Sequence, residues 1–154
     1  MTENTRILVV EDETSIRRLI HAALDGGNHT LEETGSGTDA LAMLADGTFD
    51  LLILDLMLED ITGWQVLDEM ASRGLRKGIR VMILTAQSAE RDILRGWRMG
   101  VDEYCMKPFE PDDFTAKVNS VLGARAEDLK KRREEEIAKT QLLNLVDTVF
   151  DGNA

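Results

Sequence analysis

Residues 51–57 read LLILDLM, so a run of branched apolar residues leads directly into Asp55 before apolar residues resume. A lone ionised carboxylate in a dry core is costly, or its pKa shifts until the group is neutral. The stretch therefore predicts a buried strand that places Asp55 at the edge of the core, with a partner for its charge.

Similar apolar runs recur on either side of this stretch. RILVV (6–10) and RVMILT (80–85) are the clearest, and HTLEET (29–34) and DEYCMK (102–107) are weaker candidates. Runs that are apolar on both faces are typical of parallel strands that are covered on both sides.

Helical periodicity fills the segments between these runs. Apolar residues at i, i+3 and i+4 predict helices over 14–25, 38–45, 64–71 and 89–99, and Pro111 is well placed near the start of a fifth. Strict alternation with short connections predicts an α/β fold, a parallel sheet with helices on both faces. Ligands of such folds bind beyond the carboxyl ends of the strands.

Composition limits the possible functions. The 154 residues are enough for one core, and 43% are hydrophobic, which is typical of a globular protein. With 18 basic and 29 acidic residues the net charge is −11, so we expect no direct contact with nucleic acid. The lone Cys105 excludes an intrachain disulfide and is expected to be a buried thiol. No signal peptide or membrane span is expected, and a cytoplasmic protein follows by default.

The C-terminal segment has a different pattern. No Gly or Pro occurs from Ala124 to Asp151, which predicts one helix that runs on from residue 112 to about 149. Arg132 and Glu136 are among the opposite charges at i, i+4 that would stabilise it. Its end carries apolar residues that a monomer would expose: Ile137, Leu142, Leu143, Leu145, Val146, Val149 and Phe150. Such a cluster indicates a partner surface or a truncated linker.

Polar residues occur where the predicted strands end. Glu11 and Asp12 follow the first strand, Asp55 ends the third, Thr85 the fourth, and Lys107 the fifth. Carboxylate oxygens suit Mg²⁺, and acids, a hydroxyl and a lysine are the groups that phosphoryl transfer to an aspartate needs.

Each of these residues also has a simpler explanation. An acid pair can stabilise a helix N-terminus, an aspartate can cap a turn, a threonine can end a strand, and a lysine can be solvated. The joint occurrence at successive strand ends favours a site.

By the motifs ILVVEDE, LLILDLM, VMILTA and DEYCMKPF, in this order and spacing, residues 5 to about 123 resemble the receiver domain of two-component response regulators. The resemblance implies a five-stranded parallel sheet in the order 2-1-3-4-5, which is flavodoxin-like, flanked by five helices. We expect a receiver domain over 1–123 and a helical extension over 124–154, which serves dimerisation or is a linker.

The resemblance also implies roles for individual residues. Asp55 would accept a phosphoryl group from a sensor histidine kinase or a phosphotransfer protein. Mg²⁺ would be bound by Glu11, Asp12, Asp55 and the backbone carbonyl of Met57. Phosphate binding and switching would use Thr85, the small Ala86, Lys107 and Tyr104, an aromatic residue that moves inward on activation. The Lys107–Pro108 peptide bond would be cis, and Gly63 matches a glycine of the family.

The implied function is a phosphorylation switch and not an enzyme that acts on other molecules. Phosphorylation would change the face of the fourth helix, fifth strand and fifth helix, with a homodimer through the fifth helix and the tail. Trp97 and Arg98 depart from the family pattern on the fourth helix, and Glu59 replaces a common proline, which predicts a looser loop. The alternatives are a scaffold without phosphotransfer and a magnesium-dependent phosphohydrolase. Met57, where such hydrolases carry a second acid, counts against the hydrolase.

Overall fold

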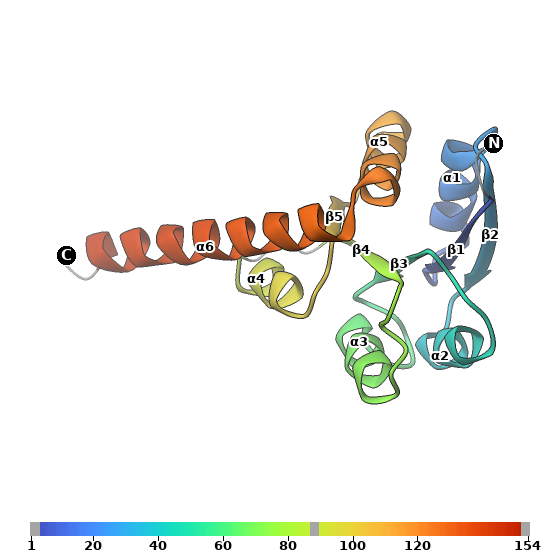
Figure 1. The fold of residues 1–154 in the computed structure, drawn as a ribbon, viewed down its shortest axis with the longest axis horizontal. Coiled ribbons are helices and arrows are strands. Elements are labelled where there is room, and N and C mark those ends of the chain that lie inside the picture. Colours follow the sequence, from blue (N-terminus) through green and yellow to red (C-terminus); the bar gives the residue numbers. More distant parts are fainter. Residues whose placement is uncertain (1–3, 87–89, 152–154) are drawn as a thin grey trace.

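Strands and helices alternate along the chain as the sequence predicts (Figure 1). The structure, a computed structural model, describes residues 4–86 and 90–151. The elements are β1 (Thr5–Val10), α1 (Thr14–Leu24), β2 (His29–Thr34), α2 (Gly37–Asp46), β3 (Leu51–Asp55), α3 (Gly63–Ser72), β4 (Arg80–Thr85), α4 (Glu90–Arg98), β5 (Glu103–Met106), α5 (Pro111–Gly123) and α6 (Ala126–Asp151). The first residue of the helix expected over 89–99 lies outside the described residues.

The five strands form one parallel sheet in the order β2-β1-β3-β4-β5, which confirms the predicted fold class and strand order. In the register, Val10 pairs with Leu54 and Asp55 pairs with Leu84. The carboxyl ends of β1, β3 and β4 therefore lie at the same rim of the sheet.

Helices cover both faces of the sheet (Figure 1). Alternate residues of β1 divide between two cores: Leu8 and Val10 pack with α2, α3 and α4, and Ile7 and Val9 pack with α1 and α5. Every residue of β3 is buried, as expected for the central apolar run. Cys105 is a buried free thiol, and burial raises its pKa to about 11.

The prediction of one helix from residue 112 to about 149 is wrong. The chain leaves α5 at Gly123, and Ala124 has an extended backbone with φ −80° and ψ 149°. A new helix then begins, in which the carbonyl of Arg125 accepts the N–H groups of Asp128 and Leu129 at 3.0 and 3.1 Å. Consequently α6 leaves α5 at a sharp angle and passes α4 (Figure 1).

The middle of α6 also has a core-facing side, which the sequence analysis did not expect. Leu129 is buried, and Ile137 packs against the core on the α2–α3–α4 face. Beyond α4 the expected exposed cluster is present: Leu142, Leu143, Leu145, Val146 and Val149 are 41–61% exposed. The side chain of Phe150 lies outside the described part of the chain. Among the described residues, no helix is both long and apolar enough to cross a bilayer.

Candidate functional site

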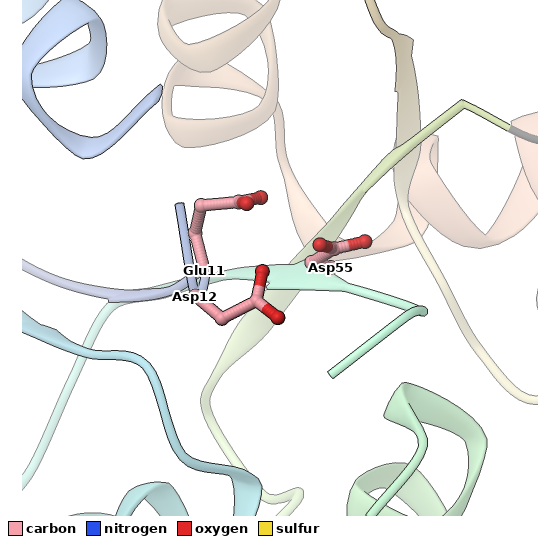
Figure 2. A group of neighbouring side chains, drawn as sticks. All are labelled: Glu11, Asp12 and Asp55. Atoms are coloured by element: carbon pink, nitrogen blue, oxygen red, sulfur yellow. The ribbon is translucent and has the colours of Figure 1, made fainter. Parts of the chain in front are cut away.

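The rim at the carboxyl ends of the strands gathers three carboxylates (Figure 2). Glu11 and Asp12 follow β1, and Asp55 is the last residue of β3, the neighbour of β1 in the sheet. One oxygen of each side chain lies within 4.8 Å of the others. The structure thus brings together the acids that the sequence places at separate strand ends.

Lys107 provides a positive charge at the same rim. Its Nζ lies 2.7 Å from Oε2 of Glu11 and 3.1 Å from Oδ2 of Asp55. Glu11 and Asp55 are both almost fully buried, so they need this partner. One ammonium among three carboxylates leaves an excess of negative charge, which favours binding of a further cation.

The pKa shifts reflect this crowding. Burial raises the pKa of Glu11 from its ordinary 4.5 to about 7, against the ion pair with Lys107, and the charge of Asp55 adds to the rise. Burial alone would lower the pKa of Lys107, but its hydrogen bonds and ion pairs with Glu11 and Asp55 outweigh this and raise it. Lys107 therefore stays charged, while Glu11 changes its protonation near neutral pH.

These residues fit Mg²⁺. The ion takes oxygen ligands and is usually bound through one or two carboxylates, with water and substrate oxygens at the remaining positions. Glu11, Asp12 and Asp55 present such oxygens at one point, and Asp12 is only half-buried, which leaves the site accessible. The chemistry of the donor set therefore agrees with the metal that the resemblance implies.

The loop after β3 holds Asp55 in place. The N–H of Met57 donates to Oδ1 of Asp55 at 3.0 Å, and the N–H of Gly63 donates to the carbonyl of Leu56 at 3.0 Å. A Cβ on Gly63 would lie 2.6 Å from the carbonyl oxygen of Asp55, which explains the glycine at this position.

The same loop is anchored to α2. The carboxylate of Asp60 accepts hydrogen bonds from the backbone N–H groups of Gly37 and Thr38 and from the hydroxyl of Ser36. These bonds, above all those of the backbone, hold the pKa of Asp60 well below its usual range. Glu59 predicts a looser loop, but hydrogen bonds of the next residue, Asp60, attach this loop to the start of α2.

Thr85 and Ala86 complete the rim. Thr85 is fully buried at the end of β4, and its carbonyl accepts the N–H of Lys107 at 2.9 Å. Ala86, which follows Thr85 in the chain, is exposed. The Lys107–Pro108 peptide bond is cis, as the resemblance implies.

Tyr104 lies inward, against α4. It is 7% exposed, and its hydroxyl donates to the carbonyls of Asp92 and Ile93 at 3.2 and 3.0 Å. Burial raises the pKa of its phenol, so the hydroxyl stays protonated. The sequence analysis missed Gly96, whose hydrogen in place of a side chain leaves room for this hydroxyl.

We expect Mg²⁺ affinity to fall as pH drops through about 7, because Glu11 then binds a proton that the metal must displace. Without metal the shift acts on stability with a defined sign. Between pH 4.5 and about 7 the folded state binds more protons than the unfolded state, so the free energy of unfolding decreases as pH rises through this window.

Magnesium titrations about one pH unit below and one above the pKa of Glu11 measure the two affinities and check this expectation. Glu11→Gln should flatten the difference, since the amide does not titrate. Equal affinities of the unaltered protein at both pH values would contradict it.

Comparison with known proteins identifies the family. Residues 7–119 match the family model of the response regulator receiver domain, so the chain belongs to this family. Transcriptional regulatory protein ResD of Bacillus subtilis is 34% identical over 121 residues, which cover 79% of this chain and 49% of ResD. DNA-binding response regulator MtrA of Mycobacterium tuberculosis is 33% identical over 152 residues, which cover 97% of this chain and 60% of MtrA. The chain thus spans about half the length of these relatives.

Among solved structures, response regulator protein TrrA of Thermotoga maritima is similar with a TM-score of 0.66 and 34% sequence identity. The match covers 76% of this chain and 98% of TrrA, which was crystallised in complex with Mg²⁺ and BeF.

Proposed function

We propose that this chain is a phosphorylation switch that accepts a phosphoryl group on Asp55 from a sensor histidine kinase or a phosphotransfer protein. The observation that carries the proposal is the position of the Asp55 carboxylate, which lies between two acids and the ammonium of Lys107. Membership of the receiver family and the likeness to TrrA support it.

In this proposal each residue of the rim has a distinct task. An oxygen of Asp55 attacks the phosphorus, the bond from phosphorus to the donor imidazole breaks, and the imidazole takes up a proton. Glu11, Asp12, Asp55 and the Met57 carbonyl would hold Mg²⁺, which supplies charge neutralisation for the phosphoryl oxygens. Lys107 then pairs with a phosphoryl oxygen, Thr85 donates its hydroxyl to another, and the small Ala86 leaves room for the group.

Incubation with acetyl phosphate and Mg²⁺ separates this proposal from its alternatives. A receiver gains a phosphate that is lost slowly, which intact-mass measurement over time detects. A scaffold without phosphotransfer gains none, and a phosphohydrolase consumes acetyl phosphate steadily without accumulating the adduct. Either of the latter outcomes would overturn the proposal.

We propose that phosphorylation changes the face formed by α4, β5 and α5, and helix α6, and that these surfaces pass the signal to a partner. The signalling system is proposed to be cytoplasmic. Added charge at Asp55 draws Thr85 and Lys107 towards it, and Tyr104 of β5 relays the change through its contacts with α4. Curated relatives are named as transcriptional or DNA-binding regulators, which supports a role in controlling a further module or partner. That the acidic chain itself makes no contact with nucleic acid stays a prediction.

We further propose that the exposed end of α6 forms a homodimer. Leu142, Leu145 and Val149 recur at i, i+3 and i+7, which is the spacing of a helix–helix seam, and each is more than half exposed. The double substitution Leu142→Glu with Leu145→Glu is expected to shift a dimer to monomer in sedimentation equilibrium, because it places charge in that seam.

The control is Gln141→Glu with Thr148→Glu, which adds the same two charges at exposed positions of α6 outside the three seam residues and should leave the mass in solution unchanged. Point substitutions are preferable to deletion of residues 125–154, which would also remove the buried Leu129. A dimer that survives both glutamates contradicts self-association through the tail.

A further inference from the structure

Helix α6 is attached to the receiver domain by ion pairs with buried acids. Arg132 donates to both oxygens of Glu103 at 2.9 and 3.2 Å, and Arg133 pairs with Asp102. Asp102 and Glu103 are 4% and 6% exposed, respectively. If α6 left this position, these buried carboxylates would lose the arginine cations, which is strongly unfavourable. The ion pairs therefore stabilise the docked position of α6.

One of the two acids that hold α6, Glu103, also contacts the switch residue Tyr104. Glu103 directly precedes Tyr104, and its Oε1 accepts the N–H of Tyr104 at 2.9 Å. The carboxylate of Glu103 therefore connects Arg132 of α6 directly to the backbone of Tyr104.

A second contact runs through Trp97. The guanidinium of Arg132 lies 5.6 Å from the centre of the Trp97 ring. That ring packs edge-on against Tyr104, with 5.3 Å between ring centres and an angle of 70°. Arg132 thus contacts both the residue before Tyr104 and the ring on which Tyr104 packs.

The inward position of Tyr104 depends on a third feature, the absence of a side chain at Gly96. A Cβ there would lie 1.6 Å from the Tyr104 hydroxyl and 2.7 Å from its ring carbon Cζ. Gly96 therefore leaves room for the inward tyrosine, Trp97 packs against it from α4, and Arg132 contacts its neighbours from α6.

We propose that α6 positions Tyr104, with Arg132 as the positioning residue. Docking of α6 on the receiver domain and phosphorylation of Asp55 then stabilise each other. The inference rests on the proposed function, in which phosphorylation of Asp55 favours the inward position of Tyr104. The docked α6 favours the same arrangement, and two events that favour one state are coupled reciprocally. Helix α6 then regulates the site. In return, phosphorylation of Asp55 changes how tightly α6 is docked, and with it the position of the exposed apolar residues at the C-terminal end of α6.

The coupling is tested with beryllofluoride and Mg²⁺, a phosphoryl mimic, on the full chain. Affinity is read from tryptophan fluorescence, with Trp64→Phe as the background so that Trp97 is the reporter. Arg132→Ala is expected to weaken binding at least about fivefold, the lower range of allosteric couplings. Arg132→Lys should restore part of the loss, and Lys130→Ala, an exposed neighbour on α6, should have no effect.

The reciprocal measurement is hydrogen exchange of α6. Beryllofluoride should slow amide exchange over residues 126–140 in the unaltered protein, and should do so less in Arg132→Ala. Gly96→Ala provides a second variant that acts on Tyr104 from α4, and it should both weaken beryllofluoride binding and speed exchange in α6.

Equal beryllofluoride affinity in the unaltered protein, Arg132→Ala and Gly96→Ala, with α6 exchange unaffected by the mimic, would overturn the coupling and leave the proposed function intact. No beryllofluoride binding by the unaltered protein would instead remove the proposed function, and the coupling with it. The two failures are therefore distinguishable.

Discussion

Asp55→Asn is expected to reduce phosphoryl uptake from acetyl phosphate to background. The amide has nearly the same shape as the carboxylate, so the hydrogen bond from the Met57 N–H can persist, but the amide is not a nucleophile towards phosphorus. It also removes one negative charge from the rim, which weakens attraction for Mg²⁺. Quantification of the phosphorylated fraction after a fixed incubation measures the effect.

Glu59→Gln is the matched control, because it makes the same change from acid to amide at an exposed position in the next loop. It should keep normal uptake. If Asp55→Asn took up phosphate at the rate of the unaltered protein, another residue would be the acceptor and the proposed chemistry would be wrong.

Gly63→Ala is expected to destabilise the fold by about 3 kcal/mol, the upper part of the range for overpacked positions. The added methyl would lie 2.6 Å from the carbonyl oxygen of Asp55 and 2.8 Å from Cα of Leu56, both of which are backbone atoms that cannot turn aside. Because relief requires the backbone around Asp55 to move, phosphoryl uptake should fall as well. Chemical denaturation and the uptake assay measure the two effects.

Gly123→Ala makes the same chemical change where the added methyl has no atom within 4 Å apart from its chain neighbours and the backbone of its own helix. Since alanine favours helix over glycine by about 1 kcal/mol, this control is expected to be neutral or slightly stabilising. Similar stabilities for the two variants would show that the close approach at Gly63 has no energetic consequence.

The sheet and the rim were predictable because their signals are local. Apolar runs such as 51–54 identify parallel strands, and a polar residue at each strand end must lie on a common rim once the strands are parallel. The approach of Glu11 and Asp12 to Asp55 follows from the adjacency of β1 and β3, an order that the resemblance to receiver domains implies, whereas Lys107 reaches Asp55 across the width of β4. The distances within the site, and the raised pKa of Glu11, depend on burial that the sequence does not state.

The start of the tail helix was missed although a signal for it exists. Gly123 is a poor helix residue, and Glu127 with Asp128 places acids in a first turn, which is typical of a new helix. The absence of proline permits one continuous helix but does not exclude a break between two helices.

The contacts of α6 had no comparable signal. Arg132 and Arg133 pair with acids 29 and 31 residues earlier, and only the fold brings them together. In the sequence Arg132 has an apparent partner at i+4, Glu136, but the buried Glu103 accepts hydrogen bonds from both terminal nitrogens of its guanidinium. The depth at which Glu103 lies decides this choice of partner, because a buried acid gains more from a cation than an exposed one does.

The most direct test is to locate the phosphoryl group in the unaltered protein. Peptide mapping after incubation with acetyl phosphate and Mg²⁺ is predicted to find it on Asp55 alone, and chelation of the metal should prevent its attachment. A phosphoryl group on any other side chain, or attachment that does not depend on the metal, would contradict a magnesium-assisted acceptor site at the rim of the sheet.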